Sequence, residues 1–266
     1  MHLFPVVFRA LFAILALCIA SWSAAQTPDT TQAATQPEPA TQAQATSSQP
    51  LTLFPWKAEY RASYKAGVPI NASAVRELKQ QKDGTWLYNF DVDSFILDIK
   101  ENSIIRWQDG LVVPVQYNYH RSGWVTTRKA QLNFDWSKLT VRNNVQNKPW
   151  TMSVSPGTQD KLSYQLQLHM DLIAGKKEMH YQVADGGKLK QMDFGVVGEE
   201  VLDTKLGKIA TVYVDKLREP DAKRFTRLWF AKDLNYLLIK MIQKEEDGEV
   251  YEINLEKATI NGKEVR

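Results

Sequence analysis

The feature that most constrains the fold is an alternation of apolar and polar residues with a period of two. Between Trp86 and Val92 every second residue is aromatic or Val, and the residues between them are mostly polar. The run Val113–Tyr119 repeats the pattern. Side chains alternate between the two faces of a β-strand, so this period is typical of strands with one buried face. The sequence therefore predicts a mainly β fold.

Asp-Gly pairs separate many of these runs and predict hairpin turns. Both residues of such a pair accept positive φ, as the favoured two-residue turn requires. We expect antiparallel neighbours, most clearly for Tyr236–Lys244 and Val250–Lys257, read as two long strands joined by a tight turn. The four pairs are Asp83-Gly84, Asp109-Gly110, Asp185-Gly186 and Asp247-Gly248.

One segment, Asp160–Ile173, breaks the period of two. Thr158 or Asp160 could cap the start of a helix, and Gly175 with the two lysines after it could end one. Its even positions are apolar, which also suits a strand, but its Leu, Gln and Met residues are good helix formers. We therefore expect one principal α-helix packed on a large curved antiparallel sheet, a half-open barrel.

The N-terminal 25 residues have the order of a cleavable export signal. Arg9 precedes the apolar run Ala10–Ala20, and small residues follow, which predicts cleavage between Ala25 and Gln26 and a periplasmic protein. The alternative is a membrane anchor, but a bilayer core needs about 20 apolar residues. Cys18 could be lipidated, yet Leu17 stands where a lipoprotein signal has a small residue. After cleavage we expect no transmembrane span.

Residues 26–50 differ in composition from the rest of the chain. They are rich in Thr, Gln, Ala and Pro and contain no aromatic or branched aliphatic residue, so they cannot bury enough surface to fold. We expect a disordered tether there and a single β-rich domain over 51–266. Because basic and acidic residues are interspersed and the formal net charge is only +3, we expect no nucleic-acid partner.

Four segments together resemble a known family. They are Tyr60–Tyr64, Asp160–Ser163, Phe194–Lys208 and Leu228–Lys240. As a set they resemble the bacterial envelope family catalogued as domain of unknown function 3108. The family often has a proline where Leu238 stands here. The resemblance implies an exported antiparallel fold similar to the half-open barrels of lipoprotein carriers, and it brings no catalytic residues.

Residues that could carry chemistry are scattered. The histidines that remain after export, His120, His169 and His180, are too far apart in sequence for a typical zinc site, so we expect no metal and no cofactor. Asp91 and Asp93 share one strand face and could divide acid and base roles in a hydrolase. That face is opposite the aromatic one, so a solvated acidic face is the simpler interpretation.

Aromatic residues are abundant, and most of them can be explained as core. One helix cannot cover a sheet of many strands, however, so we expect a concave apolar face, which is a common ligand site. We expect aromatic side chains to line this face, in particular Trp86, Trp107, Tyr117 and Trp229. Three functions remain open: a non-enzymatic carrier of an apolar or lipid-like ligand, an envelope assembly protein that docks a protein or cell-wall partner, and a hydrolase using Asp91 and Asp93.

Overall fold

The computed structural model describes residues 51–65, 70–95, 97–124, 126–218 and 222–265. The export signal, its cleavage between Ala25 and Gln26, and the tether 26–50 therefore lie outside the described residues.

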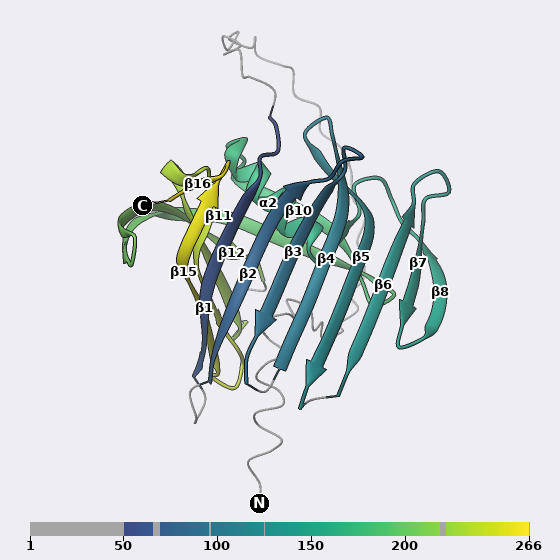
Figure 1. The fold of residues 1–266 in the computed structure, drawn as a ribbon, viewed down its shortest axis with the longest axis horizontal. Helices are drawn as coiled ribbons and strands as arrows, with labels where there is room; N and C mark the ends of the chain where they lie inside the picture. Colours follow the sequence, from purple (N-terminus) through teal and green to yellow (C-terminus); the bar gives the residue numbers. More distant parts are fainter. Residues whose placement is uncertain (1–50, 66–69, 96, 125, 219–221, 266) are drawn as a thin grey trace, which may run out of the picture.

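The described chain forms a 16-stranded sheet with one α-helix, so the predicted mainly β fold with one principal helix is confirmed (Figure 1). The elements are β1 (Trp56–Lys65), β2 (Ile70–Gln80), β3 (Trp86–Asp93), β4 (Leu97–Gln108), β5 (Leu111–Gly123), β6 (Arg128–Asp135), β7 (Thr140–Val145), β8 (Lys148–Ser153), β9 (Gln159–Asp160), α2 (Ser163–Ile173), β10 (Glu178–Asp185), β11 (Lys188–Thr204), β12 (Gly207–Lys216), β13 (Phe225–Ala231), the 3₁₀ helix η1 (Lys232–Leu234), β14 (Leu237–Lys244), β15 (Val250–Ile260) and β16 (Lys263–Glu264).

The sheet consists of two antiparallel arms, and the pairing of β1 with β15 joins them at the middle of the sheet. Its order is β8-β7-β6-β5-β4-β3-β2-β1-β15-β14-β13-β12-β11-β10-β9, so the first strand pairs with β15 near the end of the chain. All of these pairs are antiparallel except that of β9 with β10. The sheet is open and does not close into a barrel, as the expectation of a half-open barrel required.

The Asp-Gly pairs mark turns, but only one forms the expected two-residue turn. Asp109 and Gly110 both have positive φ and join β4 to β5. In the β10–β11 hairpin the two turn residues are Gly186 and Gly187, one position later than predicted. The connections at Asp83 and Asp247 are longer, because several residues separate their paired strand ends.

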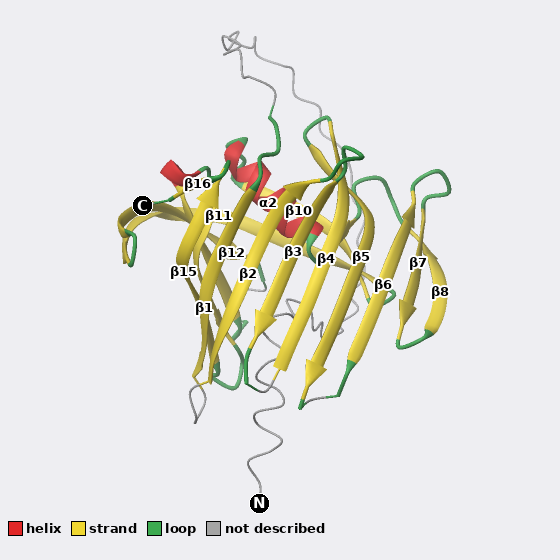
Figure 2. Ribbon diagram, viewed as in Figure 1, coloured by secondary structure: helices red, strands yellow, loops and turns green. Residues whose placement is uncertain are grey.

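Helix α2 lies on the concave side of the sheet, behind its upper half in the view of Figure 2. It packs mainly against β5, β9 and β10, and nearly all of its residues are buried. Asp160 satisfies the first backbone donors, because its Oδ1 accepts hydrogen bonds from Leu162 N (2.8 Å) and Ser163 N (2.7 Å). Its Oδ2 accepts a bond of 2.6 Å from the Ser103 hydroxyl of β4, which fixes the start of the helix to the sheet.

The sheet curves so strongly that its two arms touch. A Cβ atom added to Gly187, at the tip of the β10–β11 hairpin, would lie 2.2 Å from Cζ2 of Trp150 on the edge strand β8. Only a residue without a side chain allows this approach. The pairing of β11 with β12 shifts register between Val196 and Gly198, and a β-bulge of this kind bends the strand that carries it.

The concave side holds a single hydrophobic core that includes α2 and the inward residues of most strands. Within the described residues, no helix is long and apolar enough to span a membrane.

Candidate functional site

Three of the four aromatic residues predicted to line the concave face do belong to the core. Trp86 and Tyr117 are buried, and Trp107 is half-buried and donates from Nε1 to the carbonyl oxygen of Leu51 at 3.1 Å. Whether they bind a ligand stays a prediction.

Trp229 is on the other face, so its predicted place on the concave side is wrong. It alternates with Leu228 and Phe230, which are in the core, and it shares its face with Arg227. Its indole Nε1 donates to the Glu200 carboxylate, and the Lys240 ammonium lies 5.7 Å from its ring centroid. The run Leu228–Ala231 is apolar on both faces, so periodicity could not assign the side of Trp229.

A cluster of buried and half-buried polar side chains crosses the middle of the concave face. The Tyr117 hydroxyl donates to the Glu101 carboxylate, and Arg76 donates to the Tyr88 hydroxyl at 3.4 Å while its guanidinium lies 4.7 Å from the ring centroid of Phe90. Burial raises the pKa of Glu101, an effect opposed by the nearby Lys161 charge and by the Tyr117 hydrogen bond. Sequence reasoning missed this cluster. The sequence did contain a signal for it: Glu101 is an acid at a position of β4 where the period of two places apolar, inward-facing residues.

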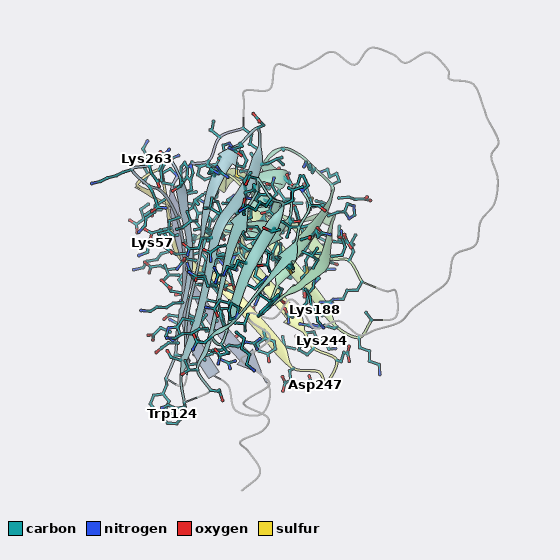
Figure 3. The ribbon with its side chains drawn as sticks, turned by 90° about the vertical axis from the view of Figure 1, so that its right-hand side faces the viewer. Lys57, Trp124, Lys188, Lys244, Asp247 and Lys263 are labelled. Carbon is teal, nitrogen blue, oxygen red and sulfur yellow. The ribbon has the colours of Figure 1, made fainter. Side chains whose placement is uncertain are left out.

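Below this polar cluster the concave face is apolar on both arms of the sheet. Val92 and Ile99 contribute from β3 and β4, and Leu228, Met241 and Ile253 from β13, β14 and β15. Each lies two or more residues from the hairpins at the lower end of the sheet. In Figure 3 the tips of two of these hairpins, marked by Trp124 and Asp247, lie on opposite sides of that end.

Polar side chains replace apolar ones at the lower end of β13 and β14. Thr226 and Gln243 are paired across these strands and are fully buried on the core face. Neither Oγ1 of Thr226 nor Oε1 of Gln243 has a hydrogen-bond partner. Leaving a buried polar atom unpaired costs about 1–3 kcal/mol, so such atoms call for a physical reason. One residue pair deeper, Leu228 and Met241 are apolar, which makes this wall amphipathic along the strands.

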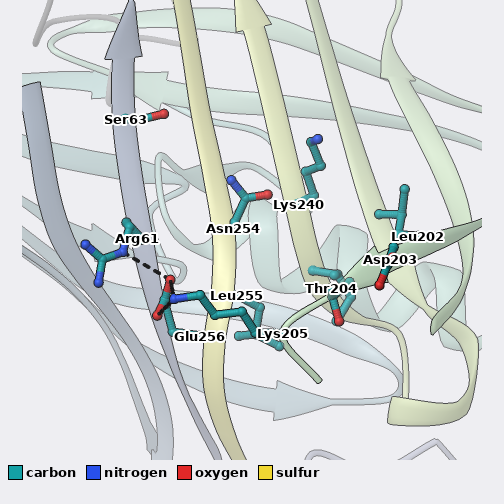
Figure 4. Close-up of a pocket in the computed structure, with 11 residues that line it drawn as sticks. Arg61, Ser63, Leu202, Asp203, Thr204, Lys205, Lys240, Asn254, Leu255 and Glu256 are labelled. Atoms are coloured by element: carbon teal, nitrogen blue, oxygen red, sulfur yellow. Dashed lines mark hydrogen bonds and ion pairs between the residues drawn. The ribbon is translucent and has the colours of Figure 1, made fainter. Parts of the chain in front are cut away.

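A second candidate is a pocket of about 490 Å³ on the outer face, beside the end of the β11–β12 hairpin (Figure 4). Glu256 is one of the residues that line this pocket, and the Glu256 carboxylate forms ion pairs with Arg61 Nε at 3.1 Å and with Lys205 Nζ at 2.5 Å. Arg61 and Lys205 are well exposed, so these ion pairs add little stability. Most of the residues that line it are polar or charged, Ser63 and Asn254 among them, although apolar atoms make up more of the lining surface than polar ones do.

Asp91 and Asp93, the candidate hydrolase pair, are both exposed on the outer face of β3. Partial burial raises the pKa of Asp91, and the Lys100 charge opposes that shift. Asp93 lines an outer groove of about 640 Å³ beside Ser94 and Phe95.

The structure places two of the histidines in different surroundings. His169 is buried and its Nε2 lies 2.6 Å from the Asn235 carbonyl oxygen, whereas His180 is exposed and its Nδ1 lies 2.7 Å from Asp193 Oδ1. Among the described residues there is no group of three or more His, Cys, Asp or Glu side chains that could hold a metal ion.

Comparisons with known proteins gave a family match and matches to solved structures. Residues 52–256 match a family described as "Protein of unknown function (DUF3108)". A β-barrel-like protein of domain of unknown function DUF1849 from Brucella abortus is similar over 79% of this chain and 99% of its own, with a TM-score of 0.55 at 13% identity. A putative exported protein with a YmcC-like fold from Bacteroides fragilis aligns over 77% of this chain and 95% of its own, with a TM-score of 0.29 at 8% identity. The comparison with curated proteins gave no match.

Proposed function

Because this chain belongs to the DUF3108 family of proteins of unknown function, we infer its role from its own residues. We propose that it is a non-enzymatic periplasmic carrier that shelters a lipid-like ligand. The alkyl part would lie against the lower concave face, and the head would lie at Thr226 and Gln243. Because both side chains are fully buried, the two arms of the sheet would have to part at this end to admit the ligand. The observation that carries the proposal is the amphipathic wall of β13 and β14, with unpaired polar atoms at its end and apolar residues deeper in.

The apolar part of the wall supports an alkyl tail. Helix α2 packs mainly on β5, β9 and β10, and among the described residues no other α-helix covers the concave face. Residues advance by about 3.3 Å along a strand, so the four-residue step from Leu97 at the rim to Glu101 in the polar cluster spans about 13 Å. A tail enclosed there would gain about 25 cal/mol for each Å² of apolar surface removed from water, before the costs of binding.

The polar end of the wall supports a head that donates a hydrogen bond. Oε1 of Gln243 can only accept, and the hydroxyl of Thr226 can donate or accept. A ligand hydroxyl or amide N–H would pair with the Gln243 oxygen and remove the penalty of leaving it unsatisfied. A ligand with only acceptor oxygens would leave it unpaired, so the site should discriminate between the two.

The experiment is a titration of delipidated protein with dodecanol and with dodecyl methyl ether, followed by tryptophan fluorescence and calorimetry. Both probes carry the same alkyl chain, but only the alcohol donates a hydrogen bond. We expect saturable binding of both, with the alcohol about tenfold tighter, as one hydrogen bond at a buried acceptor would give. Native mass spectrometry of protein from the periplasm should also show a co-purifying lipid.

Two variants locate the site. Met241→Trp places a larger side chain on the concave face and should weaken both probes. Gln243→Leu removes the acceptor that only the alcohol can satisfy and should reduce the preference for the alcohol alone. Trp229→Phe, on the outer face, is the control and should bind like the original protein. Absence of any saturable response from folded, delipidated protein would sink the carrier proposal and leave the envelope interaction protein as the next candidate.

That second candidate is favoured by the outer pocket around Glu256. Its exposed Arg61 and Lys205 suit a polar protein or cell-wall partner. Arg61→Ala with Lys205→Ala should then abolish partner capture without changing the binding of dodecanol.

A further inference from the structure

We propose that the lower rim of the sheet, from the β3–β4 turn to the β7–β8 turn, docks on the surface of an anionic phospholipid bilayer. Its contacts would be the aromatic side chains of Phe95 and Trp124 and the cations Arg128, Lys129 and Lys148. This inference concerns a different surface from the ligand site and does not require that any ligand be bound.

Two large aromatic side chains are exposed side by side at this rim. Phe95 is 83% exposed and Trp124 71% exposed, and their ring centroids are 4.9 Å apart in an edge-to-face arrangement. They come from neighbouring hairpin tips, since β4 and β5 are paired. Figure 3 places Trp124 at the extreme lower end of the sheet, far from Lys263 at the upper end. Exposed aromatic pairs of this kind are unusual unless they contact a partner.

Hydrogen bonds hold both tips in place. Ser94 Oγ donates to Leu97 O at 2.9 Å and accepts from Leu97 N at 3.1 Å, which closes the turn that carries Phe95. Arg121 donates to Thr126 O at 3.0 Å across the turn that carries Trp124. Gly123 has a φ of 114°, a conformation that glycine adopts easily, and it directs the chain into this turn. Presenting the two rings therefore requires little additional ordering.

The strands next to these tips carry the positive charge of the protein. Residues 111–153 contain six basic residues and one acid, Asp135, giving a formal net charge of +5. The whole chain has +3, so the remainder carries −2. Acidic and basic residues are therefore not interspersed in β5–β8 as they are in the chain as a whole. Two acids do lie near the rim, since Asp93 and Asp98 are opposite each other in β3 and β4 at the base of the β3–β4 turn.

Three of these cations are at the rim itself. Arg128 and Lys129 begin β6, and Lys148 begins β8. The β7–β8 turn lies against the start of β6, because Lys129 N donates to Gln146 Oε1 at 2.6 Å and Gln146 N donates to Lys129 O at 3.1 Å. Within the described part of the chain, no acidic side chain forms an ion pair with Arg128, Lys129 or Lys148.

A bilayer surface matches this combination better than a purely electrostatic partner does. Trp is favoured at the membrane–water interface, where its apolar ring and its polar N–H are both satisfied. Each Lys or Arg near an anionic leaflet adds about 1 kcal/mol, which is about fivefold in affinity. A soluble polyanion would attract the cations but would give no role to Phe95 and Trp124.

The test is co-sedimentation with vesicles of phosphatidylglycerol and phosphatidylethanolamine, compared with vesicles of phosphatidylcholine alone. The protein is used as the cell processes it, with the same N terminus in all variants as checked by intact mass, because the apolar run Ala10–Ala20 would itself bind lipid. We expect binding to the anionic vesicles that weakens with salt. Trp124→Ala should weaken it by roughly tenfold, in line with the burial of a large ring, and Arg128→Gln with Lys129→Gln by about fivefold per cation.

Matched controls lie at other places on the fold. Leu111→Ala removes an exposed apolar side chain from the opposite end of β5, and Lys257→Gln with Lys263→Gln removes two exposed cations outside β5–β8. Both should bind vesicles normally. Unchanged binding in a Phe95→Ala, Trp124→Ala variant would overturn the proposal. Loss of binding in the cation variant alone, with the aromatic variant unaffected, would also overturn it, because the attraction to the vesicles would then be purely electrostatic.

Failure of this proposal and failure of the carrier function are distinguishable. Dodecanol titrations contain no vesicles, so Trp124→Ala should leave them unchanged. Gln243→Leu should in turn leave vesicle binding unchanged.

Discussion

Gly187 lies against the indole ring of Trp150, so that the tip of the β10–β11 hairpin contacts the edge strand at the far end of the same sheet. This contact sets how far the sheet can curl, and it depends on the absence of one carbon atom.

Gly187→Ala should therefore lower the free energy of unfolding by more than Gly186→Ala. Both residues have positive φ, so both substitutions carry backbone strain. Only position 187 adds a clash, since a Cβ at position 186 meets no atom within 4 Å. We expect an extra loss of about 1–3 kcal/mol for position 187, measured by urea unfolding. Equal losses would show that Trp150 moves aside freely.

Thr226→Val should raise the free energy of unfolding of the ligand-free protein by about 1 kcal/mol, because it removes a buried hydroxyl that has no partner. The matched control is Thr211→Val. Thr211 is equally buried, but its hydroxyl donates to Glu200 O at 2.8 Å, so its removal should destabilise the fold. Destabilisation at both positions would mean that Thr226 is satisfied inside the protein, and the head-group site would lose its main support.

The stability of the protein should depend on pH through His169. Burial lowers the pKa of this imidazole to about 4 from 6.5, although its bond to the Asn235 carbonyl opposes the shift. Between these values the unfolded chain binds more protons, so the free energy of unfolding falls as the pH is lowered from 6.5 to 4. The total loss should be about 3 kcal/mol, the equivalent of the shift in pKa.

Urea unfolding at several pH values, compared with His169→Asn, measures this contribution. Burial also raises the pKa values of Glu101 and Asp160, so their contribution to the free energy of unfolding rises as the pH falls. Both proteins contain these two acids, so their contribution cancels in the difference between the proteins. His180→Asn is the control, since that ring is exposed. A constant difference between the original protein and His169→Asn across this range would contradict the assignment.

Ser103 and Asp160 should show a strong coupling in a double-mutant cycle. Asp160→Ala leaves the backbone N–H groups of Leu162 and Ser163 without their acceptor and should lower the free energy of unfolding by about 3 kcal/mol. Ser103→Ala should cost about 1–3 kcal/mol alone and much less once Asp160 is absent. Additive effects would show that the hydroxyl and the carboxylate act independently.

The strands and the helix could be predicted because their signals are local. Alternation identified β3 and β5, and capping residues identified α2 although its apolar pattern also suited a strand. The face of Trp229 could not be predicted, since its neighbours Leu228 and Phe230 are also apolar. Such a run has no polar phase to mark the outside.

The polar residues of the concave face were missed for a related reason. Glu101, Thr226 and Gln243 each occupy the apolar phase of a strand, and a single exception in a pattern is easily read as noise. Their partners, or their lack of partners, depend on strands and on a helix far away in sequence. A search for polar residues on the apolar phase would have found all three.

The pairing of β1 with β15 has a consequence for biogenesis. Trp56, near the start of the described chain, pairs with Ile260, near its end, and the strands between them form the two arms of the sheet. During synthesis the hydrogen-bonding edge of β1 remains vacant until almost the whole polypeptide has emerged. Forming so long-range a pair is slow, because the loop must close before its contacts stabilise it. A nascent chain of this topology stays without its central seam until β15 arrives, and premature termination between Lys244 and Val250 would leave a sheet in two halves with an exposed, aggregation-prone edge.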